Sequence, residues 1–201
     1  LTDIIRNSDI VLMMADDERA CFRVDELAMR ANNHPIVTYA GCHHRAMSGM
    51  VAYTWSPKTA CYGCLSLFLN IDPSREHNAT VDYSATSMHE QVVTRGWSGL
   101  GLDINFISLF HARIVLEFML LLTEQESDSR ELLEHNLYIW GNHPCSLIGQ
   151  NNETVARFEH PFELIQLTVP KNPDCAICRG TGLIPENDEK VILETVGEEE
   201  W

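Results

Sequence analysis

The sequence predicts an α/β protein in which helices cover both faces of a mostly parallel β-sheet. Three short apolar runs have the length and composition of strands buried on both faces, namely residues 9–14, 35–41 and 49–55. Between the first two runs, residues 19–31 carry apolar side chains at helical spacing. A buried strand, a helix and a second buried strand in succession are typical of parallel α/β units, which is why we predict this class.

Composition limits the size and the partners of the protein. The chain has 201 residues, 45% of them hydrophobic and 21% charged, so we expect one globular domain. Its formal net charge is −15 with only 14 Lys and Arg residues, whereas nucleic-acid binding needs clustered cations, so we expect no nucleic-acid partner. The seven cysteines form two close pairs and three single residues, which is not the pattern of a disulfide framework. We therefore expect a cytoplasmic protein.

Two pairs of cysteines share the spacing C-x-x-C. The first pair is Cys61 and Cys64, and the second pair is Cys175 and Cys178. Four thiolates are the ligands of a tetrahedral structural zinc site, and the short spacing lets one turn direct two sulfurs at a metal about 2.3 Å away. We predict structural Zn²⁺ bound by these four cysteines. A redox pair and unrelated thiols are the alternatives, but a redox pair normally begins a helix, and neither pair precedes a convincing amphipathic pattern.

Two aspartates follow the first predicted strand. Asp16 and Asp17 lie where this strand meets the predicted helix at residues 19–31. Ligands of open α/β sheets bind at the carboxyl ends of strands, which makes both residues candidates for chemistry. Aspartate is also a preferred helix N-cap and interacts favourably with the helix dipole. Both interpretations stay open on spacing alone.

Two further groups contain nucleophiles. Cys42, His43 and His44 follow the second predicted strand, and Cys145 lies in a predicted turn. Adjacent side chains of a loop point in different directions, and a half-buried structural thiol is the simpler interpretation of Cys145. We therefore expect no catalytic site at either place.

The middle of the chain combines a polar segment with a strongly apolar one. Residues 65–98 lack periodicity and predict a long surface loop with a functional role. Residues 103–122 predict the strongest helix, apolar on most of its circumference and therefore packed in the core. We expect no membrane span there, because His111, Arg113 and Glu117 would be costly at membrane depth.

The segment at residues 124–178 predicts a small antiparallel addition. A polar turn leads into a short helix at 130–134, and strands are predicted at 137–140, 154–158 and 162–169.

This order of parts resembles the E1-like adenylyltransferases, the group of ThiF, MoeB and the ubiquitin-activating enzymes. The matching parts are the strand at 9–14 running into the aspartates, the helix at 19–31, the strand at 34–41, residues 48–51, 61–64, the helix entered through 99–101, and residues 170–178. The resemblance covers most of residues 1–178 and implies the C-terminal half of a Rossmann-like E1/ThiF fold. Its parts would be the sheet core with the first zinc knuckle (1–64), a crossover loop (65–98), a core helix (99–123), the antiparallel addition with the second zinc knuckle (124–178) and a tail (179–201).

The resemblance also implies an activity. In that family a strand-end aspartate acts at the ATP and Mg²⁺ site, so Asp16 or Asp17 would be catalytic, and Arg23 is the nearest match to the family's arginine, offset by a residue or two. The implied reaction is ATP-dependent activation of the C-terminal carboxylate of a ubiquitin-like or sulfur-carrier protein. The implied assembly is a homodimer or a pairing with an upstream N-terminal half.

The chain departs from the family pattern in three respects. Residues 137–169, which include Cys145, are additional to the smallest members of the family. No G-x-G-x-x-G nucleotide loop occurs, and we expect that loop upstream of Leu1. Residues 65–98, where thioester-forming members place a cysteine, contain none. The alternative is therefore a non-catalytic, zinc-containing pseudo-E1 module that binds a partner or completes an active site in trans.

Overall fold

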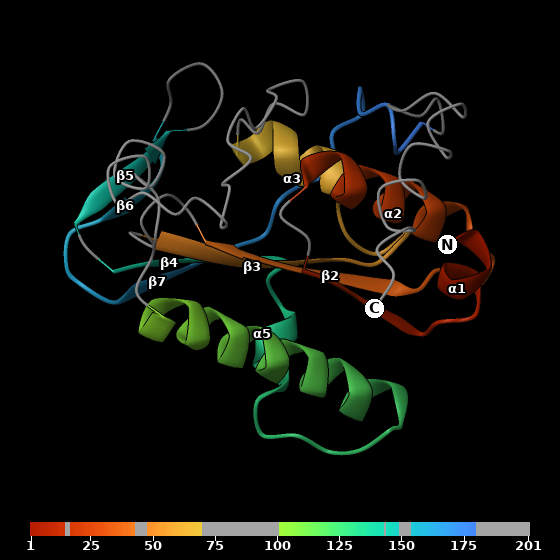
Figure 1. Cartoon of the computed structure of the whole chain (residues 1–201), viewed down its shortest axis with the longest axis horizontal. Coiled ribbons are helices and arrows are strands. Elements are labelled where there is room, and N and C mark those ends of the chain that lie inside the picture. The colour runs from red at the N-terminus through yellow and green to blue at the C-terminus, as the bar shows by residue number, and fades with distance from the viewer. Residues whose placement is uncertain (15–16, 43–47, 70–100, 143, 149–153, 180–201) are drawn as a thin grey trace, which may run out of the picture.

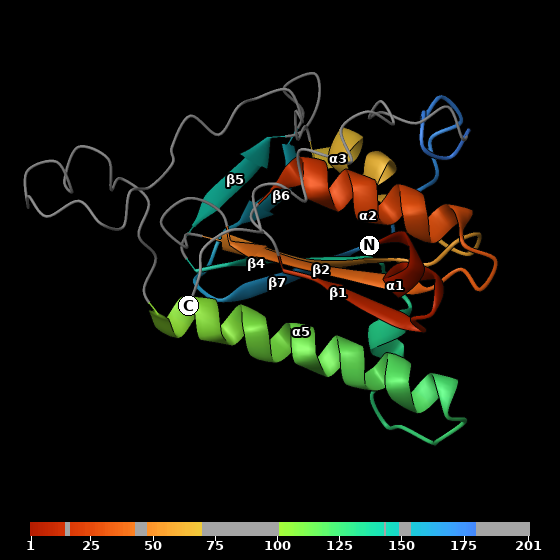
Figure 2. The same cartoon turned by 45° about the vertical axis from the view of Figure 1, so that its right-hand side comes forward.

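The computed structural model describes residues 1–14, 17–42, 48–69, 101–142, 144–148 and 154–179. These residues form a five-stranded sheet with helices on both faces. Helices α2 (Glu18–Arg30) and α3 (Tyr62–Leu69) cover one face, and α5 (Gly101–Leu122) lies along the other (Figures 1 and 2). The predicted mixed α/β class is confirmed.

The sheet has the strand order β1-β2-β3-β4-β7. The strands are β1 (Ile10–Met13), β2 (Ile36–Cys42), β3 (Ser48–Thr54), β4 (Leu137–Gly141) and β7 (Glu163–Leu167). Only β1 and β2 are parallel, and every other pair is antiparallel. The prediction of a mostly parallel sheet is therefore wrong.

The length of one connection explains this error. Five residues separate the end of β2 from the start of β3, whereas a crossover between parallel strands needs a dozen or more. Buried apolar runs look the same in strands of either direction, so composition alone carried no information on direction. The parallel unit that the sequence does specify is β1–α2–β2, in which Ile10 is opposite Ile36.

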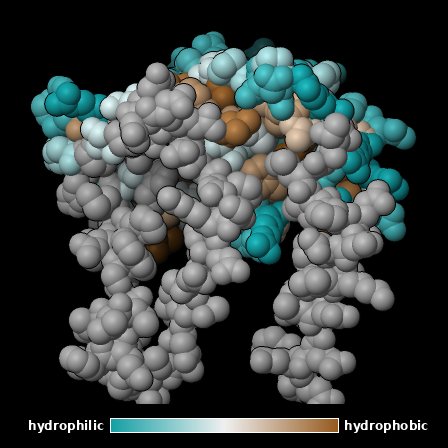
Figure 3. Space-filling view, turned by 90° about the horizontal axis from the view of Figure 1, so that it is seen from above, coloured by the Kyte–Doolittle hydropathy of each residue, from teal (hydrophilic) through white to brown (hydrophobic). Residues whose placement is uncertain are grey.

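The first three predicted strands and the helix between the first two are found within one residue of their predicted bounds. Helix α1 (Thr2–Arg6) precedes β1, and α2 packs its buried residues, among them Phe22 and Leu27, on the sheet. Figure 3 views the molecule from the side of α2, where the coloured residues are hydrophobic near the middle and mostly hydrophilic around it.

Helix α5 packs through one stripe only. Ile107, Ile114 and Phe118 are buried against the sheet. The approach is close, since a Cβ on Gly49 of β3 would lie 1.8 Å from Cδ1 of Ile107. The outer side is nevertheless apolar and exposed, with Leu109 73% exposed. The expectation that the helix is buried around most of its circumference is therefore wrong.

Part of α5 has the composition of a membrane span. Ile104–Leu122 is long and apolar enough to cross a membrane by length and hydropathy. In this structure the segment lies along the sheet, with Glu117 buried and its Oε1 2.7 Å from Nη2 of Arg113. The predicted cytoplasmic location stays a prediction.

The C-terminal part differs from the predicted addition. A 3₁₀ turn, η2 (Arg130–Leu133), occupies the predicted short helix. Strands β4 and β7 extend the main sheet, and only β5 (Cys145–Ile148) and β6 (Thr154–Phe158) form a separate two-stranded sheet. Cys145 thus begins a strand and does not lie in a turn.

Several sequence predictions fall on residues outside the described ranges. These are Asp16, His43, His44, residues 70–98 of the predicted crossover loop and the tail from residue 180 onward.

Candidate metal centre

The two cysteine pairs come together although 114 residues separate Cys61 from Cys175. The Sγ of Cys61 lies 3.4 Å from that of Cys175 and 3.2 Å from that of Cys178, and the Sγ atoms of Cys64 and Cys178 are 3.6 Å apart. All four sulfurs lie within 4.8 Å of one another. Sulfurs at tetrahedral corners about 2.3 Å from a zinc ion would be roughly 3.8 Å apart. The four thiols are therefore spaced to bind one metal ion.

A turn and a helix start direct the first pair. The backbone N–H of Trp55 donates to Oγ1 of Thr59 at 2.7 Å, and the N–H of Thr59 donates to the carbonyl of Trp55 at 2.9 Å. Helix α3 then begins, and its first turn is closed by the Leu65 N–H donating to the Cys61 carbonyl at 3.1 Å. Both sulfurs consequently lie on one helical turn.

Sequence reasoning missed this helix. Its eight residues are apolar, small or aromatic and carry no charge, so no amphipathic period marks it. A C-x-x-C pair at a helix start also has the setting of a redox pair. Convergence of the second pair on the same point favours metal binding instead.

The second pair lies in a tight turn that contacts the first. The Cys175 N–H donates to the Asn172 carbonyl at 3.1 Å, and the Arg179 N–H donates to the Cys175 carbonyl at 3.0 Å. The N–H of Asn172 donates to Sγ of Cys64 at 3.2 Å. A hydrogen bond to an ionised acceptor is stronger than one between neutral groups, so this contact favours Cys64 as a thiolate.

Gly63 allows the second pair to approach the helix. A Cβ at this position would lie 2.9 Å from Sγ of Cys175 and 3.1 Å from Cδ1 of Ile177. The first distance is shorter than real Cβ contacts, so any side chain here would displace the ligand sulfur or its neighbour. The position of Cys175 therefore requires a glycine directly before Cys64.

The thiols form a coupled proton-binding cluster. The hydrogen bond with Cys61 lowers the pKa of Cys64 to about 5, with the Asn172 N–H as a further cause, while the same contact with Cys64 and then burial raise the pKa of Cys61. Burial raises the pKa of Cys178 to about 11. Metal binding to such a cluster replaces protons with one cation, and a soft, all-sulfur donor set of four fits Zn²⁺.

A buried carboxylate is hydrogen-bonded to the backbone of the first cysteine pair. Asp25 of α2 is fully buried, and its Oδ2 accepts the N–H of Tyr62 at 2.8 Å, the residue next to Cys61. Its Oδ1 accepts the hydroxyls of Thr54 at 2.5 Å and Tyr39 at 2.9 Å. Such outer contacts orient metal ligands. Asp25 thereby ties the backbone of the first pair to α2, β2 and β3.

The sequence pattern of α2 contains a feature that could have identified Asp25 as a buried residue. Cys21, Asp25 and Ala28 are spaced four and three residues apart on α2, and all three are buried. A charged residue on the apolar face of a helix is unusual unless it has partners, which marks it for attention.

Asp17 and Arg23, which the resemblance assigns to the ATP and Mg²⁺ site, and the single Cys42 do not belong to this cluster. Asp17 is the N-cap of α2, and its exposed side chain accepts the Arg19 N–H at 2.9 Å. Arg23 is buried, with Nη1 3.2 Å from Oε2 of Glu26. Cys42 is exposed at the end of β2. The observed contact of Asp17 is the one expected of a helix cap.

Comparison of the chain with models of known protein families gives no match, and comparison with curated protein sequences also gives none.

Proposed function

We propose that this chain is part of an ATP-dependent, E1-like (ThiF-type) adenylyltransferase that activates the C-terminal carboxylate of a ubiquitin-like or sulfur-carrier protein. The observation that supports this most is the convergence of Cys61, Cys64, Cys175 and Cys178 on one metal-sized site. The resemblance to this family assigns structural zinc to those positions. The parallel β1–α2 unit with an aspartate at the end of its strand supports the same proposal.

Zinc has a structural role in this proposal. Four thiolates fill a tetrahedral site, whereas catalytic zinc keeps a position open for water or substrate. The metal would join the start of α3 to the segment before residue 179, and Asp25 and Gly63 would shape the site. The chemistry must then take place elsewhere in the protein.

The reaction in this proposal occurs at the carboxyl end of β1. The carboxylate of the carrier protein attacks the α-phosphate of ATP, which forms an acyl-adenylate and releases pyrophosphate. Asp16 or Asp17 would hold Mg²⁺, which offsets the charge of the phosphates as they separate. Arg23 would contribute to ATP binding, and the glycine-rich nucleotide loop would come from outside these residues.

A second candidate is a non-catalytic pseudo-E1 module that binds a partner or completes an active site in trans. One observation favours it, because the Asp17 carboxylate already accepts the Arg19 N–H as a helix cap. That contact accounts for an aspartate at this position without any chemistry.

Substitution of the aspartates separates the two candidates. In the intact protein with its nucleotide loop, Asp16→Asn or Asp17→Asn should lower ATP–pyrophosphate exchange at least about tenfold, or about 1.4 kcal/mol. Asparagine is as good an N-cap as aspartate, so the melting temperature should hardly change. Asp3→Asn, in the exposed first turn of α1, is the matched control. Normal exchange in both variants would favour the non-catalytic module.

A further inference from the structure

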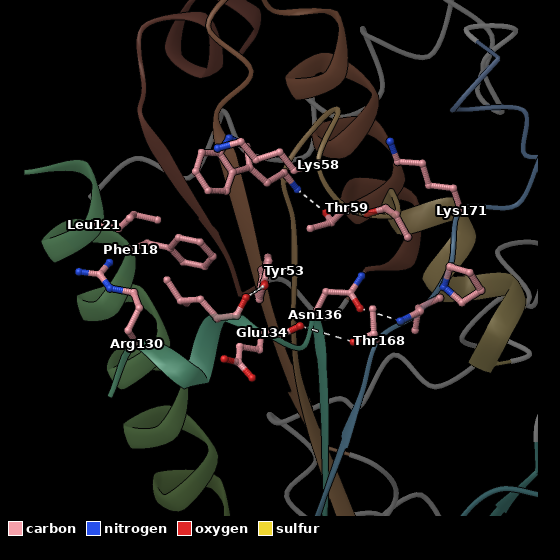
Figure 4. A pocket seen from close by; sticks show the side chains of 15 residues that line it. Tyr53, Lys58, Thr59, Phe118, Leu121, Arg130, Glu134, Asn136, Thr168 and Lys171 are labelled. Carbon is pink, nitrogen blue, oxygen red and sulfur yellow. Dashed lines mark hydrogen bonds between the residues drawn. The ribbon is translucent and has the colours of Figure 1, made fainter. Parts of the chain in front are cut away.

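A cavity of about 640 Å³ lies between α5, η2 and the ends of β3, β4 and β7 (Figure 4). Thr54, at the end of β3, is opposite Val37 at the start of β2. Since β1 and β2 are parallel, Asp17 follows the other ends of these strands. The cavity is therefore separate from the site proposed for adenylation.

Aromatic side chains form much of its wall. Phe118 of α5 meets Tyr53 edge to face with ring centroids 4.7 Å apart, and it meets Trp55 in the same way at 5.9 Å. Figure 4 shows Phe118 and Leu121 reaching from α5 towards Tyr53. Rigid rings of this kind offer flat apolar surfaces to a ligand that carries a ring of its own.

Three cations line the cavity, and neutral groups hold each of them. The Lys58 ammonium lies 3.3 Å from the Trp55 ring centroid. Arg130 donates to the carbonyls of Glu117 at 3.2 Å and Gln125 at 2.7 Å, and Lys171 donates to the carbonyl of Pro57.

The charges of these cations are not neutralised locally. Among the described residues, none of the three forms an ion pair with a carboxylate. Glu134, the one acidic residue in the lining, is exposed. In a chain of net charge −15 with 14 Lys and Arg residues, this is a local surplus of positive charge. It favours an anionic ligand.

A buried amide adds a hydrogen-bond donor. Asn136 is 2% exposed, and its Oδ1 accepts the Val169 N–H at 2.7 Å. Within the described part of the chain, its Nδ2 has no acceptor. In Figure 4 a dashed line marks the hydrogen bond that the Asn136 amide oxygen accepts, and the amide nitrogen points to the other side. A buried donor without a partner destabilises the protein, and an acceptor on a ligand would remove that cost.

We infer that this cavity binds a small anion with a flat aromatic body, such as an aromatic carboxylate. The ring packs against Phe118 and Trp55, the anionic group faces the cations, and an acceptor meets Nδ2 of Asn136. The cavity volume lies within the roughly 300–1,000 Å³ of small-molecule sites, which are mostly apolar with few polar groups.

Fluorescence titration of the zinc-loaded full chain with 1-anilinonaphthalene-8-sulfonate, an aromatic anion, tests this inference. The double variant Lys58→Gln, Lys171→Gln should bind the probe about tenfold more weakly, because two favourable charges are lost. Binding of the neutral N-phenyl-1-naphthylamine should not change. The matched control is Arg157→Gln, which removes an exposed cation on β6 and should leave the affinity for both probes unchanged.

Two results would overturn the inference. One is an unchanged affinity of the anionic probe in the double variant. The other is loss of probe binding in Leu109→Ser, which would place the probe on the exposed side of α5. Competition gives an independent readout: 2-naphthoate should displace the probe and 2-naphthamide should not, and equal displacement by the amide would also contradict the anionic specificity.

Discussion

Asp25 links the metal centre to the core of the fold. Its carboxylate accepts three hydrogen bonds, and burial is still the largest influence on it, so its pKa is raised from 3.8 to about 6. The folded protein therefore binds a proton at Asp25 more tightly than the unfolded chain does. By linkage, the stabilisation from protonated Asp25 is complete below about pH 4 and is lost as pH rises through about 6.

The stability of Asp25→Asn against pH tests this linkage. Zinc binding itself favours high pH, because metal ligands must lose protons. We therefore compare parent and variant, both saturated with zinc, by urea unfolding at pH 5 and pH 7. From pH 5 to pH 7, the unfolding free energy of the parent minus that of the variant should decrease by on the order of 1–2 kcal/mol. A constant difference would show that Asp25 ionises with an ordinary pKa.

Helix α3 and the second cysteine pair can pack closely because residue 63 is a glycine. A Cβ on Gly63 would lie 2.9 Å from Sγ of Cys175, so Gly63→Ala must shift a ligand. We expect about 10–100-fold weaker zinc binding, as for other changes next to metal ligands. Competition with a chromophoric chelator measures it. The control is Gly41→Ala, because a Cβ there meets nothing within 4 Å. Equal zinc affinities of the two variants would contradict the geometry.

The orientation of α5 is tested by one buried and one exposed residue. Ile114 is fully buried and Leu109 is 73% exposed. Ile114→Ala should cost about 2–5 kcal/mol of unfolding free energy, through lost burial and the cavity left behind. Leu109→Ala should stay within about 0.5 kcal/mol. Equal losses in denaturant unfolding would mean that another surface covers the outer side of the helix in solution.

Local patterns predicted the elements better than their arrangement. The spans of β1, α2, β2, β3 and α5 follow from short apolar runs and helical spacing. Strand direction and the joining of β4 to the main sheet depend on connection length and on contacts distant in the chain. The burial of α5 was predicted wrongly for a different reason. Its outer side is as apolar as a buried face, but no described residue covers it.

In the metal centre, too, local patterns predicted the ligands but not the contacts between distant segments. The ligands were found because C-x-x-C spacing is dictated by the reach of two sulfurs to one metal. Its place on the apolar face of α2 marks Asp25 as unusual, but its role could not be predicted, because its three donors come from β2, β3 and α3, which no local pattern brings together.

At the scale of the whole molecule, the metal centre connects distant parts of the chain. Cys175 and Cys178 reach α3 across 114 residues of sequence. The segment from Pro170 to Arg179 forms no helix or strand of its own. Its attachment therefore depends on the four thiols, on the contact between Asn172 and Cys64, on the hydrogen bond from Lys171 to Pro57 and on the buried side chain of Ile177.

Metal analysis of the purified chain tests the central claim most directly. A site of four cysteines predicts about one zinc ion per chain, and Cys175→Ser should lower both the zinc content and the melting temperature, because metal binding is coupled to folding. Cys21→Ser controls for loss of a buried thiol outside the centre and should keep its zinc. A purified chain without zinc, or a Cys175→Ser variant with unchanged zinc content and melting temperature, would contradict the account.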